Sequence, residues 1–255
     1  LEAFRREGGE YRAACGVRGL SRRGEDWVVH TRAGALRARR VISNLQPAAT
    51  TALIDGEVER ERRRTERLDA AVRGGWGAVM LYLDIDLDRL PGGGPQHLEL
   101  VDRADEALIE GNHVFCSVGG PGDRPADDPW RPVTVSTHLR MENFVGAPNE
   151  AQRERIEAVQ SRMRETIRRR APELHAAIQR EMTASPRTFQ RFTGRDEGYV
   201  GGVPRRAGLG AYRICAAPEV APGLRLVGDA TFPGQSILAT ASGGVKAARI
   251  IAADL

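Results

Sequence analysis

The first fifty residues alternate between short apolar runs and turns rich in glycine. The run WVVHT at 27–31 and the run RRVISNL at 39–45 are both bounded by turn residues. Such runs predict β-strands, because strands are typically a few residues long and end at glycine, proline or polar residues. Pro47 has no backbone N–H and ends the second run. We therefore expect a β-meander followed by one further strand.

A second group of apolar runs follows a charged, helix-like stretch at 49–73. The run WGAVMLYLDI at 76–85 is almost continuously apolar, which predicts a strand that is covered on both faces. Three runs with partial alternation predict further strands, and the resulting sheet is expected to be antiparallel or mixed. These runs lie at 97–102, 113–120 and 132–139.

Two helices are predicted after these strands. The first has apolar residues at spacings of three, four and four, as one face of a helix requires. This stripe consists of Ile156, Val159, Met163 and Ile167. The second helix is expected to begin at Pro172, because proline suits a first helical turn. Its apolar residues would be Leu174, Ile178 and Met182, at four-residue intervals.

The chain closes with a strand–turn–helix pattern. Leu224–Val227 reads as a buried strand, Gly228 and Asp229 form the turn, and an apolar helix begins near Ser236. The order of elements indicates that one domain is interrupted by another. We expect the first domain to comprise 1–50 and 201–255, and the inserted domain to comprise 51–200.

This closing turn has the features of a site for a polar cofactor. Asp229 would lie at the strand end, where a carboxylate accepts hydrogen bonds from sugar hydroxyls. The amides at the start of the helix suit an anionic oxygen or a phosphate, and Gly228 and Gly234 allow the backbone to approach a ligand closely. The alternative is a plain strand–turn–helix in which Asp229 only caps the helix.

The net charge and its distribution do not alter the predicted fold or site. The 255 residues carry a net charge of +4, and nearly all of the positive charge is arginine. The arginine clusters at 61–67 and 162–170 are interleaved with glutamate, which predicts solvated, ion-paired helix faces. No nucleic-acid motif accompanies them, so no nucleic-acid partner is predicted.

The residues of hydrolytic and metal chemistry are scattered. Three cysteines lie far apart without a CxxC pair, so neither zinc nor a redox dithiol is predicted. The five histidines have no metal-ligand spacing, and no GxSxG elbow is present. We assign no metal ligands and no catalytic residues. A polar cluster in the segment after 182 could contact a cofactor phosphate or support a domain junction. It contains Arg187, Thr188, Arg191 and Thr193.

The sequence predicts a cytoplasmic location. Residues 1–20 carry Arg5, Arg6, Glu7, Glu10 and Arg12, among other charged side chains, and no apolar core of a signal peptide. No apolar run is long enough to span a bilayer.

The closing segment GLRLVGDATFPGQSILATASGGVKAARIIAADL closely resembles the C-terminal motif of the phytoene desaturase-like flavoproteins. That family includes the carotenoid desaturases, the carotenoid cis–trans isomerases and retinol saturase. The segment SPRTFQRFTGRDEGYVGGVP at 185–204 resembles the stretch before that motif. The pieces GGEYRAACGV and GALRARRVISNLQPAAT resemble the region where these flavoproteins rejoin the FAD sheet.

The resemblance implies an α/β fold, in which part of an FAD/NAD(P)-binding Rossmann-like domain is interrupted by a substrate domain of mixed sheet and helices. Segments 1–50 and 201–255 would belong to the FAD domain and 51–200 would bind substrate. FAD is the implied cofactor. The implied cofactor-binding residues are Gly228, Asp229, Pro233, Gly234, Ser236 and Ile237.

One departure from the family is large. Its members carry a GxGxxG fingerprint near the N-terminus, whereas GLGAYR at 208–213 fails at the last position and no other match occurs. The chain therefore resembles the C-terminal half of a family member. The N-terminal Rossmann half is expected to be missing from this sequence, encoded separately or lost.

The function implied by the resemblance is that of an FAD-dependent oxidoreductase, or its C-terminal half, acting on C–C bonds of a carotenoid or other isoprenoid polyene. Desaturation, saturation and isomerisation stay open, and the chemistry would be the flavin's own. The alternatives are a non-catalytic fragment or subunit that completes a separately encoded Rossmann half, and an amine-oxidase-like flavoprotein. The implied substrate is a hydrophobic small molecule, with a peripheral contact at the inner face of the membrane if that molecule is lipid-soluble.

Overall fold

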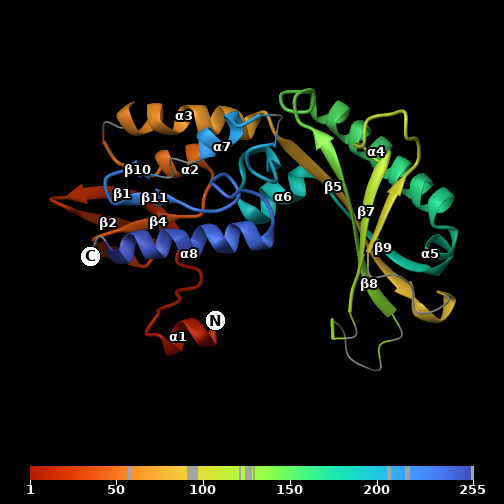
Figure 1. Ribbon diagram of the computed structural model, residues 1–255, viewed down its shortest axis with the longest axis horizontal. Helices are drawn as coiled ribbons and strands as arrows, with labels where there is room; N and C mark the ends of the chain where they lie inside the picture. The colour runs from red at the N-terminus through yellow and green to blue at the C-terminus, as the bar shows by residue number, and fades with distance from the viewer. Residues whose placement is uncertain are drawn as a thin grey trace. The chain divides into compact units, whose positions relative to one another are not determined.

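The chain divides into two compact units, shown in the computed structural model of Figure 1. Unit 1 comprises Leu1–Ala71 and Arg205–Leu255, and unit 2 comprises Val72–Pro204. The structure describes residues 1–56, 59–90, 97–120, 122–123, 128, 130–205, 208–215 and 219–253.

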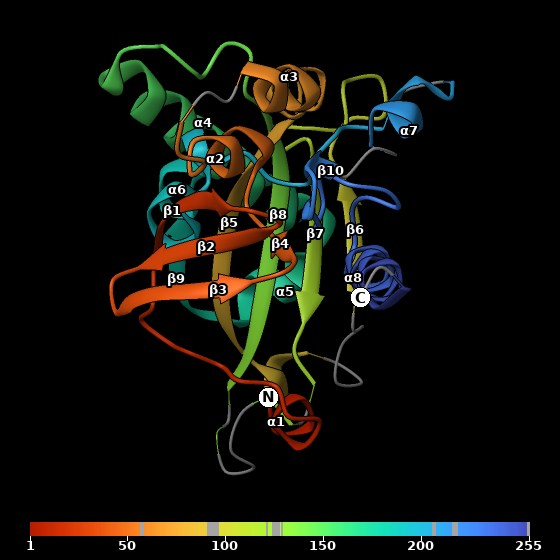
Figure 2. The same cartoon turned by 90° about the vertical axis from the view of Figure 1, so that its left-hand side faces the viewer.

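Unit 1 contains an antiparallel three-stranded meander, which confirms the expected β-meander. A short helix α1 (Glu2–Arg6) precedes it. Its strands are β1 (Val17–Arg23), β2 (Asp26–Thr31) and β3 (Gly34–Ala38), and Figure 2 shows them side by side. Trp27 on β2 is 1% exposed and donates its indole N–H to the carbonyl of Pro222, 3.1 Å away. This bond ties the meander to the C-terminal segment of the same unit.

A second small sheet of unit 1 joins distant parts of the chain. Its strand order is β10 (Glu219–Ala221), β11 (Leu224–Leu226), β4 (Val41–Ser43). Strands β11 and β4 are parallel, with Val41 N donating to Gly223 O at 2.8 Å and Val227 N to Ser43 O at 2.9 Å. Because the strands are parallel, their carboxyl ends lie at the same edge of the sheet.

The prediction of one helical stretch at 49–73 is wrong. The chain forms α2 (Pro47–Thr51) and α3 (Glu59–Arg73), separated by a segment that is paired with β1. Leu20 N donates to Leu53 O at 2.5 Å, and Asp55 N donates to Leu20 O at 2.8 Å. These bonds use backbone groups that a continuous helix would need. Two further helices complete the unit, α7 (Gly210–Cys215) and α8 (Ile237–Ala253).

Unit 2 is built on one five-stranded antiparallel sheet, so of the two expected arrangements the antiparallel one is correct. The strand order is β6, β7, β8, β5, β9. The strands are β6 (His97–Val101), β7 (His113–Val118), β8 (Trp130–Arg140), β5 (Trp76–Asp86) and β9 (Ile178–Ala184).

Helix α4 (Asn149–Arg170) covers one face of this sheet. The stripe predicted for this helix is confirmed, because all four of its apolar residues are buried. The sheet contributes alternate residues such as Val79, Leu81 and Val135, each fully buried. Burial along β5 alternates over most of its length, so the prediction of cover on both faces is wrong. The opposite face of the sheet is only half-buried.

The predicted second helix is largely wrong. Helix α5 (Pro172–Ala177) ends after six residues, and Ile178 and Met182 belong to strand β9. Ile178 pairs with Ile85, and Met182 pairs with Tyr82. The segment has the composition of a helix, but the free edge of β5 offers a full ladder of backbone hydrogen bonds. Tertiary pairing therefore outweighs local propensity.

The segment after β9, which reads as a loop in the sequence, begins with helix α6 (Pro186–Thr193). Ser185 and Thr188 form a reciprocal capping box at its start, and Gly194 ends it at φ 68°. Short 3₁₀ turns lie at Leu87–Arg89 (η1) and Asp196–Gly198 (η3).

Candidate functional site

The turn between β11 and α8 has an unusual backbone. Gly228 has φ +111° and Gly234 has φ +98°, and Ser236 has φ +96° although it carries a side chain. A Cβ atom on Gly228 would collide with Oδ1 of Asn44. Glycine is therefore required at position 228 both by the backbone conformation and by the close approach of a neighbouring loop.

Asn44 belongs to the site and was missed by the sequence analysis. It follows β4 directly, just as Gly228 follows β11, so the parallel pairing brings the two loops together at one edge. The loop is anchored by a 2.7 Å hydrogen bond between the buried hydroxyls of Ser43 and Thr50. The signal in the sequence was the polar pair Ser-Asn at the end of an apolar strand, before Pro47 starts a helix.

The segment around Asp229 folds back on itself. Thr231 donates through both its backbone N–H, at 3.2 Å, and its hydroxyl, at 3.0 Å, to the carbonyl of Gly228. Thr231 is buried, whereas Asp229 is half-buried. Helix α8 is capped by Ser236 instead, whose Oγ accepts from Ala239 N at 3.2 Å. Asp229 is thus not the cap of this helix, which removes the simple alternative for that residue.

The first turn of α8 combines polar donors with apolar side chains. Among the described residues, no hydrogen-bond acceptor faces the backbone N–H groups of Ile237 and Leu238. The side chains of the same two residues are 90% and 79% exposed. Apolar side chains this exposed are costly in water unless something covers them. A ligand with a flat apolar body and an electron-rich edge would satisfy both features.

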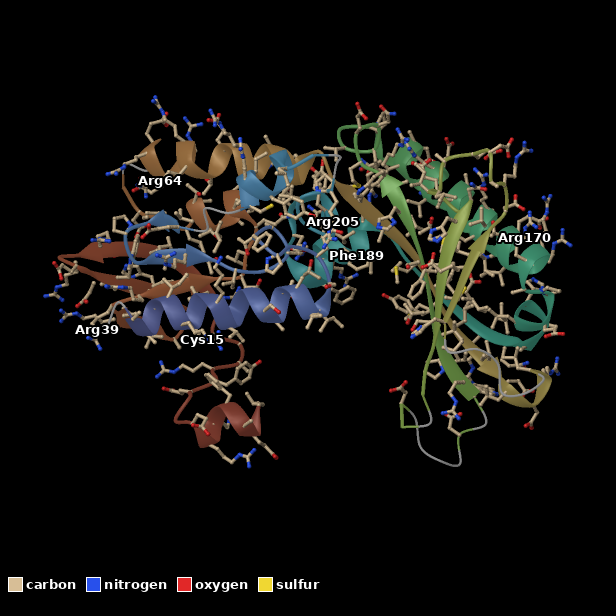
Figure 3. The ribbon with its side chains drawn as sticks, viewed as in Figure 1. Cys15, Arg39, Arg64, Arg170, Phe189 and Arg205 are labelled. Atoms are coloured by element: carbon tan, nitrogen blue, oxygen red, sulfur yellow. The ribbon has the colours of Figure 1, made fainter. Side chains whose placement is uncertain are left out.

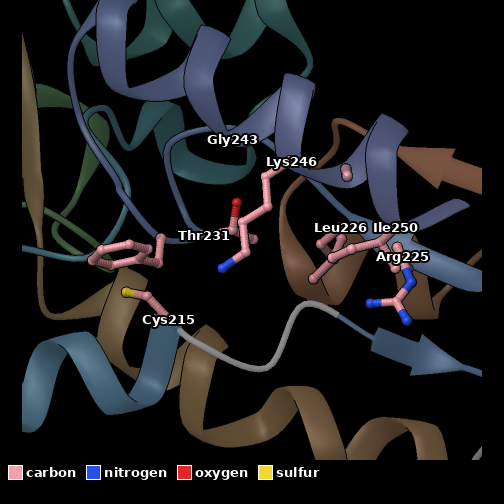
Figure 4. Close-up of a pocket in the computed structure, with 9 residues that line it drawn as sticks. Cys215, Arg225, Leu226, Thr231, Gly243, Lys246 and Ile250 are labelled. Atoms are coloured by element: carbon pink, nitrogen blue, oxygen red, sulfur yellow. The ribbon is translucent and has the colours of Figure 1, made fainter. Parts of the chain in front are cut away.

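A small pocket lies between α8 and β11, and its cavity volume is only about 30 Å³ (Figure 4). Its floor includes Gly243, where a Cβ atom would contact Pro233 Cδ at 3.6 Å and the carbonyl of Phe232 at 3.7 Å. These are ordinary van der Waals distances, so a methyl group would also fit at position 243. Gly244 has no neighbour within 4 Å of the corresponding position. Close packing on the turn therefore requires neither of the two helix glycines.

The wall of this pocket bears positive charge. Lys246 and Arg225 both line it, and Lys246 Nζ lies 5.7 Å from the centre of the Phe232 ring. The Cys215 thiol also lines it, and burial raises the pKa of that thiol. The structure thus gathers the predicted residues on one turn. Gly228 and Asp229 lie at the sheet edge, Pro233 and Gly234 in the middle, and Ser236 and Ile237 at the helix start.

The half-buried face of the sheet in unit 2 is the second candidate surface. Alternation places Trp76, Met80 and Tyr82 of β5 on it, with Phe115 of β7 and Met182 of β9. Met182 is 65% exposed. Rings pair across the strands, with Trp76 edge-on to His138 and His97 stacked on Phe115, both at 5.7 Å. This face offers an apolar, aromatic surface of the kind that a hydrophobic molecule contacts.

The polar cluster on α6 has partners inside unit 2. Arg187 donates to Gln152 Oε1 at 3.1 Å and also bonds Asn149, so it ties α6 to the start of α4. Thr193 donates to the carbonyl of Phe189 at 2.6 Å, and Arg191 lies 5.4 Å from the ring of Phe192.

The described residues were searched for groups of metal-ligating side chains and for disulfides. No group of three His, Cys, Asp or Glu side chains that could hold a metal occurs among the residues searched. Cys15, Cys116 and Cys215 are free thiols. Within the described residues, no helix has both the length and the apolar character that crossing a membrane requires.

Comparison with solved structures defines the class of fold. The chain matches about half of the chain of FAD-dependent oxidoreductases. Cyclohexylamine oxidase from Brevibacterium oxydans superposes with a TM-score of 0.59 at 14% identity, over 99% of this chain and 51% of that one. An oxidoreductase from Methanosarcina mazei gives a TM-score of 0.60 at 15% identity, over 97% and 52%. At these identities the likeness concerns the fold alone.

The sequence relatives are more particular, and they confirm the predicted resemblance over part of the chain. The chain is 32% identical over 122 residues to the chloroplastic prolycopene isomerase of Arabidopsis thaliana, covering 48% of this chain and 20% of that protein. It is 29% identical over 180 residues to the carrot (Daucus carota) enzyme of the same name, covering 69% and 29%. No protein-family model matches. The chain is thus partly homologous to prolycopene isomerases and shares its fold with about half of the chain of FAD-dependent oxidoreductases, and it matches only part of the length of either.

Proposed function

We propose that this chain is the C-terminal part of an FAD-dependent oxidoreductase that acts on C–C bonds of a carotenoid or similar isoprenoid polyene. The observation that carries the proposal is the turn from Gly228 to Ile237. It combines a sheet-edge carboxylate, a glycine-shaped backbone and unpaired amides beneath exposed apolar side chains. Partial homology to the prolycopene isomerases supports the choice of substrate class.

The residues present fit the flavin end of FAD better than its adenosine end. The amides of Ile237 and Leu238 would donate to the polar edge of the ring system, and the dipole of the 17-residue α8 favours negative charge there. Asp229 would accept hydrogen bonds from ribityl hydroxyls. No glycine-rich loop for the diphosphate occurs in this sequence. When bound, the flavin would supply the redox chemistry, and the chain's role would be to bind and orient.

The aromatic face of unit 2 would hold the polyene. Its half-buried rings and the exposed Met182 provide apolar area, and methionine adapts to irregular ligands. Unit 2 would correspond to the substrate domain and unit 1 to the FAD-domain segments. The choice among desaturation, saturation and isomerisation depends on a substrate-bound geometry, so the proposal ends at the class of reaction.

A second candidate is a subunit that completes a separately encoded Rossmann half. The observation in its favour is the edge strand β4, which is three residues long and has its Ile42 side chain 44% exposed. An unpaired parallel edge is a surface on which another strand can add. The amine-oxidase-like alternative has support only from the fold.

The experiment is a flavin titration of the purified chain. We expect riboflavin, FMN and FAD to bind with similar affinity, followed by flavin fluorescence, because the chain offers contacts to the flavin and none to the adenosine. Asp229→Ala should weaken binding about tenfold, as expected for loss of one charge-assisted hydrogen bond. Asp105→Ala, which removes an exposed carboxylate of unit 2, is the matched control. Absence of binding to all three flavins would overturn the proposal.

A further inference from the structure

Helix α3 segregates its charges into rows. Arginines at positions 60, 63, 64 and 67 follow the i, i+3, i+4, i+7 pattern, so they share one face of the helix. All four side chains are exposed. We call this set the arginine stripe. The acidic residues Glu59, Glu66 and Asp69 lie on one flank of the stripe together with Arg62. The half-buried Glu61 lies on the other flank, beside the buried row of Thr65, Leu68 and Val72. The stripe itself therefore contains no carboxylate.

Most of the stripe has no carboxylate partner in the described part of the chain. Arg63 pairs with Glu59 at 2.8 Å, on the edge toward the acidic flank. Arg64 donates only to the backbone carbonyl of Val220, at 3.4 Å. No ion pair of Arg60 or Arg67 occurs with any described residue. The cluster at 61–67 was expected to be neutralised by interleaved glutamates, and for Arg64 and Arg67 that expectation is wrong.

Helix α4 shows what a neutralised cluster looks like. Each of its seven arginines has a carboxylate partner. At its C-terminal end Arg168 and Arg169 share Glu165, and Arg170 lies 3.9 Å from Asp102. Figure 3 labels Arg64 on α3 and Arg170 on α4, and nitrogen-bearing side chains stand out from both helices. Both helices are rich in arginine, and they differ in how many of their arginines form ion pairs with carboxylates.

We propose that the arginine stripe of α3 is a docking surface for a membrane that contains anionic lipids. The inference rests on the proposed function in one respect: a polyene substrate would dissolve in a bilayer, so the protein would need to visit its surface. A cluster of about four basic residues attracts anionic headgroups with roughly 1 kcal/mol per residue. Single-stranded nucleic acid fits less well, because α3 carries no aromatic residue on which a base could stack. A duplex needs no stacking residue, and binding to it is an outcome of the test.

The test is cosedimentation with vesicles, without flavin or substrate. The chain should bind vesicles of phosphatidylcholine with about 30% phosphatidylglycerol, bind poorly to pure phosphatidylcholine, and lose binding at high salt. The triple variant Arg60→Gln, Arg64→Gln, Arg67→Gln should lower the partition coefficient roughly 100-fold, or about fivefold per arginine. The control variant Arg168→Gln, Arg169→Gln, Arg170→Gln removes the same charge from paired arginines. This control variant should lose much less of its vesicle binding than the stripe variant does.

Three outcomes would overturn the proposal. Equal binding to both kinds of vesicle would remove the charge argument. An equal loss in the control variant would show that net charge matters and the stripe does not. Retention of a short DNA duplex through the stripe, with no vesicle binding, would assign the surface to nucleic acid. Far-ultraviolet circular dichroism of both variants verifies the fold. Because no flavin is present, a negative result leaves the flavin titration to decide the proposed function separately.

Discussion

The two units of this chain differ in how completely they bury their apolar residues. Nine of the twelve largest fully buried side chains lie in unit 2, although the two units are similar in length. Conversely, fourteen of the seventeen exposed large hydrophobic side chains among the described residues lie in unit 1. Unit 2 has a finished core, with one sheet under one long helix. Unit 1 divides its strands between two small sheets and leaves apolar surface in water.

This difference in burial indicates that unit 1, and not unit 2, needs a covering partner. The exposed apolar side chains of unit 1 include Ile42 and Leu45 near the end of β4, and Ile237 and Leu238 at the start of α8. A cofactor, or further chain such as the unmatched half of the solved structures with this fold, would cover such positions. Unit 2 should therefore be the more stable part of the isolated chain.

The largest loss of stability is expected from a substitution in the core of unit 2. Leu81→Ala removes a fully buried side chain from the inner strand β5 and should lower the free energy of unfolding of unit 2 by about 3 kcal/mol. The matched change in unit 1 is Ile42→Ala, which truncates a side chain that is 44% exposed and should cost less than about 1 kcal/mol. Urea denaturation followed by circular dichroism measures both. Equal losses of free energy of unfolding in the two variants would contradict the difference in burial between the units.

A smaller effect is expected at the turn of unit 1. Gly228→Ala places a Cβ atom against Asn44 at a φ of +111° and should destabilise the fold by about 1–3 kcal/mol. Gly244→Ala is the control, since nothing lies within 4 Å of its new Cβ. In the interior of α8 that change should stabilise by about 0.5–1 kcal/mol. Thermal melts of the two variants should thus move in opposite directions. A shift in the same direction would contradict the strain assigned to Gly228.

The sequence predicted those parts of the fold whose patterns are long and local. The stripe from Ile156 to Ile167 repeats over about three turns of α4, and the run at 76–85 is too apolar for a loop. Failures came where a distant partner decided the structure. Ile178 and Met182 have helical spacing, yet the open edge of β5 makes them a strand. The segment near Leu53 leaves the helix because β1 captures its backbone.

The candidate site was likewise predictable where its residues are close in sequence, and not where they are distant. The turn after β11 could be predicted, because glycine, proline and aspartate mark it within a few residues. Asn44 could not, because its relation to Gly228 exists only once β4 and β11 pair across more than 180 residues of sequence. The charge state of α3 was also beyond pattern reading. Spacing shows which side chains share a face of the helix, but not which of the glutamates pair with which arginines.

The smallest expected effect concerns pH and the aromatic face of unit 2. Desolvation, and then the nearby imidazole of His113, lower the pKa of His138. His113 itself is held by Glu99 at 2.7 Å, and Trp76 lies edge-on to His138. A histidine with a lowered pKa is protonated more readily in the unfolded chain than in the folded one. Stability should therefore fall as the pH drops below the ordinary histidine value of about 6.5 and continue to fall down to the lowered pKa.

The measurement is the urea midpoint of the chain and of His138→Gln at several values between about pH 8 and pH 5. Glutamine does not titrate, so the variant should lose part of the decline that the unchanged chain shows below the histidine pKa. His175→Gln, in the short helix α5, is the control and should keep the full decline. If His138→Gln gives the same slope as the unchanged chain, the aromatic face does not hold its imidazole in the neutral form. The face would then be wetter than its packed rings indicate, and less suited to a hydrophobic substrate.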